Sequence, residues 1–128
     1  MKGYLLDTHT AIWFFEGNSS ISSKADQIIR NRTNRIYMSM ISAWELTIKI
    51  SLGKLRFSAD VEGFIQVAQE NDITFIPLEI AHLSVLKNLP LIHRDPFDRL
   101  LVATAIAEEM TLITIDENIA KYEVSQIW

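Results

Sequence analysis

Short apolar runs alternate along this chain with longer stretches in which apolar residues recur at helical spacing. The short runs have the length of buried strands and lie at residues 3–6, 35–40, 73–76, 112–115 and 124–127. Strands that alternate with helices are joined by right-handed crossovers, which make the strands parallel and place helices on both faces of the sheet. The pattern therefore predicts an α/β fold with a mostly parallel sheet of about five strands.

Residues that start and end helices mark six helical stretches between these runs. Asp60 and Asp95 precede two of them as caps, and the spacing from Ser23 to Asp26 is that of a capping box. Gly17 and Gly53 stand where two other helices should end, because glycine favours the left-handed conformation found there. The predicted helices cover residues 10–15, 23–29, 42–53, 60–68, 79–88 and 95–106.

Composition narrows the class of protein. We expect a single domain over residues 1–128, and the formal net charge of −4 excludes a strongly basic nucleic-acid-coating protein. An enzyme that acts on nucleic acid remains possible, because a metal ion and a local basic rim can supply the attractive field. The chain has no cysteine, which excludes disulfides and thiolate zinc sites. Its first apolar run is too short for a signal peptide or a membrane span, so we expect a soluble cytoplasmic protein without a membrane partner.

Four carboxylates fall where a predicted strand ends or the following helix begins. They are Asp7, Glu45, Asp98 and Asp116. In an open parallel sheet these points converge on one crevice at the carboxyl ends of the strands. Four ionised acids packed together repel one another unless a cation neutralises them. The sequence therefore predicts a divalent-metal site, and oxygen ligands favour Mg²⁺ or Mn²⁺ over zinc.

Each acid also has a purely structural explanation. Asp7 could cap the next helix, and Glu45 stands three residues after Ser42, as in a capping box. Asp98 could serve as a first-turn acid facing the helix dipole, and Asp116 could belong to a turn. Capping does not explain why all four acids share one edge of the sheet, so we favour a common metal site.

Four sets of segments, taken in their order and spacing, indicate a family. They are Leu5-Leu6-Asp7-Thr8-His9-Thr10, Ser42-Ala43-Trp44-Glu45 with Lys49 and Gly53-Lys54-Leu55, His93-Arg94-Asp95-Pro96-Phe97-Asp98-Arg99 with Ala103-Thr104-Ala105, and Leu112-Ile113-Thr114-Ile115-Asp116. Together they resemble the PIN-domain ribonucleases, and specifically the toxin components of VapBC-type toxin–antitoxin pairs. The resemblance covers essentially the whole chain, and residues 93–116 are its most specific part.

The resemblance implies a three-layer α/β/α sandwich and a Mg²⁺- or Mn²⁺-dependent endoribonuclease. In such an enzyme Asp7, Glu45, Asp98 and Asp116 would be both the metal ligands and the catalytic residues. They would hold an ion that activates water to hydrolyse RNA phosphodiester bonds. The resemblance also implies a toxin that is inhibited by a cognate antitoxin, as a homodimer or as a hetero-oligomer with that antitoxin. The sequence leaves open whether one ion or two are bound.

Six further residues are expected to support the acids or the substrate. They are Thr8, Lys49, Arg94, Asp95, Arg99 and Thr114. The resemblance implies that the two threonines donate hydrogen bonds beside the acids. The three basic residues could form a cationic rim that contacts phosphate. Asp95 is expected to cap a helix or to orient a metal-binding residue without contacting the ion itself. We assign no catalytic role to His9 or His93.

Consecutive aromatic residues at positions 13–15 cannot all face one side of a helix. We expect at least two of them to pack in the core, and an exposed one to belong to a hydrophobic groove or a dimer surface. Two other functions remain as alternatives. One is a non-catalytic PIN-like binding module, and the other is a Mg²⁺-dependent phosphatase or phosphotransferase with a strand-end aspartate as nucleophile. His9 stands where the latter class usually has a second aspartate.

Overall fold

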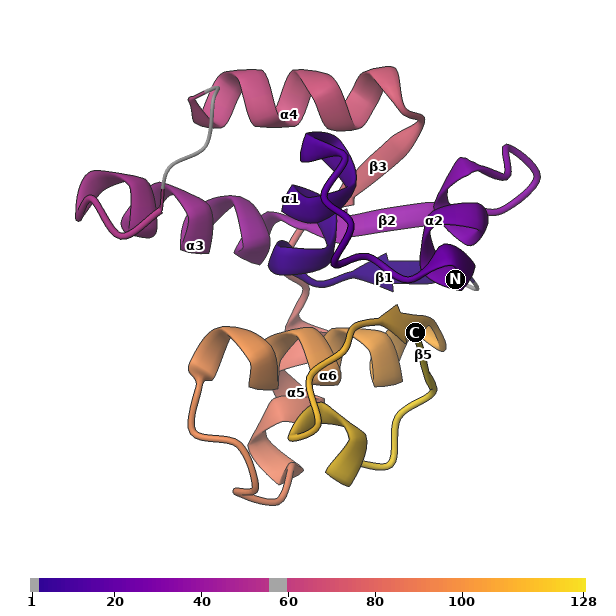
Figure 1. Ribbon diagram of the computed structural model, residues 1–128. Coiled ribbons are helices and arrows are strands. Elements are labelled where there is room, and N and C mark those ends of the chain that lie inside the picture. Colours follow the sequence, from indigo (N-terminus) through magenta and orange to yellow (C-terminus); the bar gives the residue numbers. More distant parts are fainter. Residues whose placement is uncertain (1–2, 56–59) are drawn as a thin grey trace.

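The computed structural model describes residues 3–55 and 60–128, which form a five-stranded sheet covered by helices (Figure 1). Every strand pair of this sheet is parallel, and the strand order is β3-β2-β1-β4-β5. The strands are β1 (Tyr4–Leu6), β2 (Ile36–Ser39), β3 (Ile73–Ile76), β4 (Thr111–Ile113) and β5 (Gln126–Ile127). The order reverses between β1 and β4, which makes the crevice at their carboxyl ends the topological switch point.

Helices cover both faces of the sheet. They are α1 (Thr8–Glu16), α2 (Ser23–Arg30), α3 (Met40–Ser51), α4 (Val61–Glu70), α5 (Ile80–Asn88) and α6 (Pro96–Glu108), with a 3₁₀ helix at Ile119–Lys121. Side chains alternate along each strand, so Leu6 packs with α1 to α4 on one face and Leu5 packs with α6 on the other. In Figure 1, α1, α3 and α4 lie on one side, and α5 and α6 lie on the opposite side. The predicted three-layer α/β/α sandwich is confirmed.

The five predicted strands are present, and all except β3 are shorter than predicted, with β1 beginning at Tyr4. The run at 35–40 forms a strand only over Ile36–Ser39, and the run at 124–127 only over Gln126–Ile127. The apolar run that ends at Ile115 leaves the ladder earlier, after Ile113. Ile115 is 53% exposed, so its apolar character marks the wall of a pocket instead of a buried strand position.

The predicted start of α3 and the predicted cap of α2 were wrong, and the same cause explains both. A serine closer to the N-terminus takes the cap: Ser39 accepts a hydrogen bond from Ile41 N at 3.1 Å, and Ser22 accepts one from Ala25 N at 3.0 Å. Ser42 therefore lies inside α3 and forms no capping box with Glu45. The first helix also begins earlier than predicted, at Thr8.

Other predicted helix ends are confirmed. Asp60 and Asp95 cap α4 and α6, and Gly17 closes α1 with a φ of 64°. Gly53 has a φ of 67° and follows directly on the residue that caps the end of α3. Within the described residues, none of the helices has the length and apolar character needed to cross a membrane.

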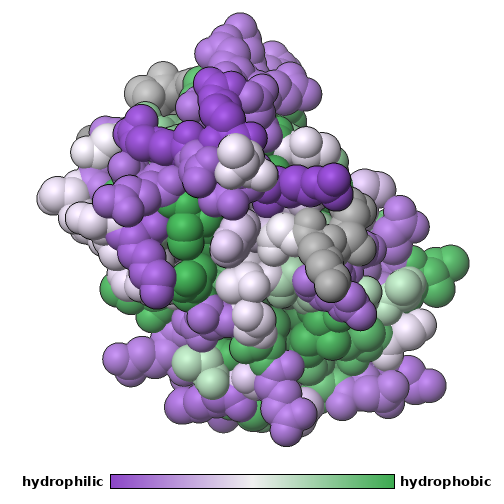
Figure 2. Space-filling view, turned by 90° about the vertical axis from the view of Figure 1, so that its right-hand side faces the viewer, coloured by the Kyte–Doolittle hydropathy of each residue, from purple (hydrophilic) through white to green (hydrophobic). Residues whose placement is uncertain are grey.

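Large apolar side chains also reach the surface. Figure 2 shows one face on which hydrophilic side chains dominate the upper part and apolar patches appear lower down. Within the described residues, five exposed apolar side chains belong to α5 or to the segments directly before and after it. They are Leu78, Ile80, Leu83, Leu91 and Ile92.

Candidate functional site

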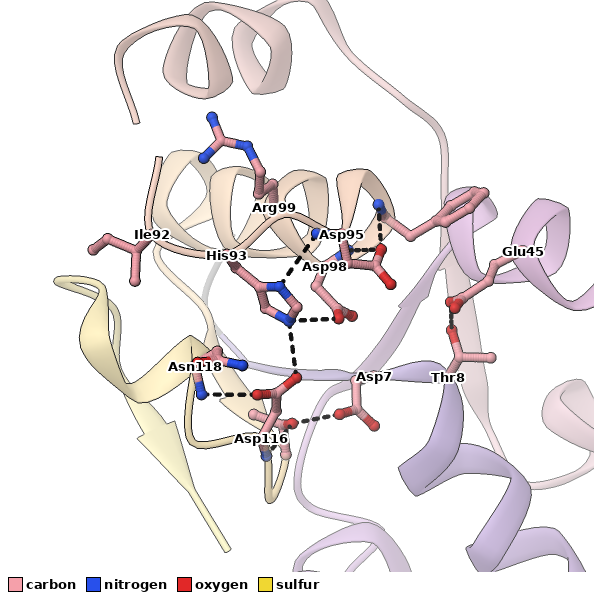
Figure 3. A network of polar contacts seen from close by, with 12 residues as sticks. Asp7, Thr8, Glu45, Ile92, His93, Asp95, Asp98, Arg99, Asp116 and Asn118 are labelled. Atoms are coloured by element: carbon pink, nitrogen blue, oxygen red, sulfur yellow. Dashed lines mark hydrogen bonds and ion pairs between the residues drawn. The ribbon is translucent and has the colours of Figure 1, made fainter. Parts of the chain in front are cut away.

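The four predicted acids meet in one pocket of about 260 Å³ at the carboxyl edge of the sheet. Asp7 directly follows β1, and Asp116 follows the neighbouring β4, so the pocket occupies the switch point of the sheet. Figure 3 shows the carboxylates arriving from separate elements. The pocket is lined by Asp7, His9, Trp13, Glu45, Lys49, Asp95, Asp98, Ile115 and Asp116.

Asp7 is fixed from two sides. It is the N-cap of α1, and its Oδ1 accepts a hydrogen bond from Thr10 N at 2.7 Å. Its Oδ2 accepts a hydrogen bond from the Thr114 hydroxyl, whose oxygen in turn accepts one from Asp116 N at 3.1 Å. Burial raises the pKa of Asp7 above its ordinary value, and the hydrogen bonds from Thr114 and Thr10 oppose that shift. Thr114 thus joins the two strand-end acids.

Glu45 reaches the same pocket from the middle of α3. Its Oε1 accepts a hydrogen bond from the Thr8 hydroxyl at 2.7 Å, and its Oε2 lies 2.9 Å from Lys49 Nζ. The Glu45 side chain is 5% exposed, whereas that of Lys49 is 33% exposed. The Glu45–Lys49 ion pair is therefore largely buried on its acidic side, where charges interact more strongly than in water.

The first turn of α6 brings two more acids. Asp95 caps the helix, since its Oδ1 accepts hydrogen bonds from Phe97 N at 2.8 Å and Asp98 N at 3.2 Å. Burial raises the pKa of Asp98 to about 7, and the charges of Asp95 and Glu45 contribute to the same shift. The negative groups around Asp98 therefore outweigh the positive ones.

His93 is the residue that the sequence analysis missed. Its Nε2 lies 3.0 Å from Asp98 Oδ2 and 3.2 Å from Asp116 Oδ2 (Figure 3). His93, Asp98 and Asp116 bring one possible ligand atom each within 4.8 Å of one another. The sequence offered one indication, because His93 lies in the proline-containing loop that leads directly to Asp98. A single loop histidine is usually a surface group, however, and only the fold brings this one to Asp116.

The predicted basic rim is mostly absent from the pocket. Of the three basic residues proposed for it, Lys49 alone is among the described residues that line the pocket. Arg94 is exposed outside it. Arg99 points away from the acids, and its guanidinium donates to Pro90 O at 2.8 Å and to the Tyr122 hydroxyl at 3.2 Å. Arg99 stands next to Asp98 in sequence, but successive helix positions face different directions.

Of the three aromatic residues at positions 13–15, two pack in the core and one lines the acidic pocket. Phe14 is buried, and Phe15 stacks edge-on against Phe64 with ring centroids 5.3 Å apart. Trp13 lines the pocket and makes edge contacts with His9 and Trp128 at centroid distances of 6.4 and 6.0 Å. Two of the three residues therefore pack in the core, as predicted, and the third forms a wall of the acidic pocket.

The donor set fits a hard divalent cation. Five carboxylates, from Asp7, Glu45, Asp95, Asp98 and Asp116, line a pocket to which Lys49 contributes a single ammonium group. Burial and mutual repulsion raise the pKa of Asp98, and burial raises that of Asp7. A cation with an oxygen preference would relieve both effects. Asp7, Glu45, Asp98 and Asp116, the four acids predicted from the sequence, all line this pocket and could hold it.

Comparison with solved structures identifies related folds. VapBC2 from Rickettsia felis, bound to a DNA fragment from its promoter, matches with a TM-score of 0.76 and 19% identity over 100% of this chain and 99% of that chain. DNA-bound VapBC from Salmonella typhimurium matches with a TM-score of 0.69 and 15% identity, over 100% and 98% of the two chains. VapBC-1 from nontypeable Haemophilus influenzae matches with a TM-score of 0.65 and 18% identity, over 99% and 97%.

Sequence comparison gives the family. No curated protein matches significantly. The family model described as the PIN domain matches residues 4–124, which is most of the chain and includes every acid of the pocket. The chain belongs to the PIN domain family.

Proposed function

We propose that this protein is a Mg²⁺- or Mn²⁺-dependent endoribonuclease that acts as the toxin of a toxin–antitoxin pair. The observation that carries the proposal is the convergence of Asp7, Glu45, Asp98 and Asp116 on one pocket at the switch point of the sheet. Membership of the PIN domain family, whose members are generally nucleases, supports phosphodiester hydrolysis. The likeness of the fold to VapBC structures supports the role of toxin.

The chain supplies a rigid set of oxygen donors. Asp7 and Asp116 would hold the ion from the ends of neighbouring strands, and Glu45 and Asp98 would complete its coordination from two helices. Thr8 and Thr114 keep two of these carboxylates oriented through their hydroxyl groups. When bound, such an ion lowers the pKa of a water molecule and stabilises negative charge on the phosphate.

The pocket also has features that suit a single RNA strand. Lys49 Nζ lies beside Glu45 and is one-third exposed, so it can contact a phosphate that approaches the acids. Trp13 and Ile115 form apolar parts of the wall against which a base or ribose can pack. We assign RNA instead of DNA through the family resemblance.

We further infer an antitoxin partner and a homodimer or hetero-oligomer that forms in the cytoplasm. The exposed apolar residues Leu78, Ile80 and Leu83 at the start of α5 support a contact with another protein, because exposed apolar surface often marks such contacts. These residues lie outside the set that lines the acidic pocket. Association through them would therefore leave the acids open to substrate or to an inhibiting segment of the antitoxin.

The test is cleavage of end-labelled total RNA by the purified protein without antitoxin. We expect discrete fragments with Mg²⁺ or Mn²⁺, none with EDTA, and none from Asp7→Asn or Asp116→Asn. The matched control is Asp26→Asn, because Asp26 pairs with Arg30 on α2 away from the pocket and should leave cleavage unchanged. Metal binding without cleavage of any RNA would favour the non-catalytic binding module and refute the proposal.

A further inference from the structure

A buried tyrosine holds the loop that carries His93. The Tyr122 side chain is 6% exposed, and its hydroxyl oxygen accepts hydrogen bonds from Ile92 N at 3.2 Å and from His93 N at 2.8 Å. The Arg99 guanidinium donates to the same oxygen and also to Pro90 O. The backbone of the loop is therefore fixed on the side that faces away from the acidic pocket.

The imidazole of His93 is fixed at both nitrogens. Its Nδ1 accepts a hydrogen bond from Asp95 N at 3.2 Å. A backbone amide can only donate, so Nδ1 presents a lone pair and the ring proton belongs to Nε2. Its Nε2–H donates a hydrogen bond to Asp116 Oδ2 at 3.2 Å, and the same nitrogen lies 3.0 Å from Asp98 Oδ2. One N–H group thus contacts two acids that come from different elements.

We propose that His93 is a positioning residue, which holds the carboxylates of Asp98 and Asp116 together through its Nε2–H and does not itself ligate the metal ion. The inference rests on the proposed metal site. Asp98 belongs to the first turn of α6 and Asp116 to the segment after β4, so nothing in the chain's local geometry keeps the two together. The shared contact offsets part of their repulsion, and a hydrogen bond from Asn118 N to Asp116 Oδ1 at 2.8 Å helps to orient the second carboxylate.

The competing interpretation makes His93 a ligand. The close approach of its Nε2 to Asp98 and Asp116 is also what a histidine–carboxylate metal site would show. A ligating Nε2 must give up its proton, which moves to Nδ1 in the neutral ring. Nδ1–H would then face Asp95 N–H, two donors would oppose each other, and the hydrogen bond beside the cap of α6 would be lost. The two interpretations therefore differ in the position of one proton.

Nuclear magnetic resonance of the wild-type protein decides between them without RNA. Long-range ¹H–¹⁵N spectra of the histidine rings, recorded with and without Mg²⁺, report which nitrogen carries the proton. We expect the Nε2–H tautomer for His93 in both states, with its signals assigned by their loss in His93→Gln. His82 is an internal reference, because its Nδ1 accepts from Glu79 N and its Nε2 faces Glu108. A His93 ring that carries its proton on Nδ1 when Mg²⁺ is bound would overturn the proposal.

Metal affinity provides the second test. Removal of an outer hydrogen-bond partner of a metal ligand typically weakens metal binding by about 10- to 100-fold, and we expect this for His93→Ala in Mg²⁺ titration calorimetry. His93→Gln should recover most of the affinity, because a glutamine amide can place a donor near the position of Nε2, whereas His93→Asn is too short to do so. Equal affinities for His93→Ala and the wild type, or no recovery by glutamine, would contradict the inference.

The tyrosine tests the loop support separately. Tyr122→Phe removes the oxygen that anchors the loop but touches no acid, so we expect several-fold weaker Mg²⁺ binding in a folded protein. The control is Tyr37→Phe, which removes a hydroxyl from the buried residue of β2 and should leave the affinity unchanged. If the protein binds Mg²⁺ as expected here but cleaves no RNA, the proposed nuclease fails and the role of His93 stands. If the protein cleaves RNA as proposed but the His93 ring carries its proton on Nδ1, the proposed nuclease stands and the role of His93 fails.

Discussion

The acidic pocket should destabilise the metal-free protein, and Asp98 offers the clearest way to measure this. Burial raises the pKa of its carboxylate from 3.8 to about 7, and the charges of Asp95, Glu45 and Asp116 add to this shift against the opposing effect of His93. The substitution Asp98→Asn keeps the size of the side chain and an oxygen that can accept from His93 Nε2. The substitution removes only the negative charge of the carboxylate, which burial and the neighbouring acids make unfavourable.

The magnitude follows from the difference between the folded and unfolded pKa values. The folded protein binds the Asp98 proton more tightly, so its stability falls as the pH rises from 3.8 to about 7. Each unit of pKa difference is worth about 1.4 kcal/mol, which gives at most about 4 kcal/mol for this group at high pH. About 3 kcal/mol of that amount should develop between about pH 5 and about pH 8. An asparagine does not titrate, so the advantage of the variant should grow over this range.

Urea unfolding in EDTA at about pH 5 and about pH 8 measures the effect directly. We expect Asp98→Asn to be more stable than the wild type at the higher pH and to lose most of that advantage at the lower pH. The control is Glu16→Gln, which removes one charge from an exposed position at the end of α1 and should give a small difference at both pH values. Saturating Mg²⁺ should shrink or reverse the advantage, because the wild type binds the ion more tightly.

One result would refute this reasoning. If the difference between Asp98→Asn and the wild type were the same at both pH values, or larger at the lower pH, the carboxylate would not be held in its protonated form by the pocket. The repulsion inferred from the five converging acids would then be absent, and with it the main physical argument for a cation.

Four further predictions concern catalysis, metal binding, RNA binding and stability. Asp7→Asn should abolish RNA cleavage at saturating Mg²⁺ while circular dichroism shows a folded protein, and retained turnover would remove Asp7 from the site. Thr8→Val deletes the hydroxyl that donates to Glu45, so calorimetry should show weaker Mg²⁺ binding by about 10-fold or more. Lys49→Ala should weaken RNA binding and reduce the log–log salt slope by about 0.7, the value for one phosphate contact to a single strand. Arg99→Ala should leave that slope unchanged but lower the melting temperature, because Arg99 bonds to the loop and Tyr122.

Much of the fold follows from local patterns in the sequence. Short apolar runs separated by helical stretches are enough to predict five parallel strands. The predicted caps Asp60 and Asp95 are confirmed, because each is the polar residue directly before its helix. The cap of α2 and the start of α3 were misplaced because several serines compete there as caps. Hydrophobic periodicity does not distinguish between caps one to three residues apart.

The candidate site was predictable in part for the same reason. Strand ends converge in a parallel sheet, so the meeting of Asp7 and Asp116 followed from the predicted topology. The roles of His93 and Arg99 did not follow, because they depend on which way a loop and a helix face. The Tyr122 hydroxyl, which lies 29 residues from His93 in the chain, orients that loop, and no local pattern connects the two.

The acids of this pocket should jointly hold a divalent cation. Crystals soaked in Mn²⁺ and measured at the manganese absorption edge would test this most directly. We expect an anomalous peak inside the pocket, contacted by carboxylate oxygens of Asp7 and Asp116 and by Glu45 or Asp98. His93 Nε2 should contact the carboxylates and not the ion. A peak elsewhere, or none in the pocket of a protein with an intact site, would contradict this expectation.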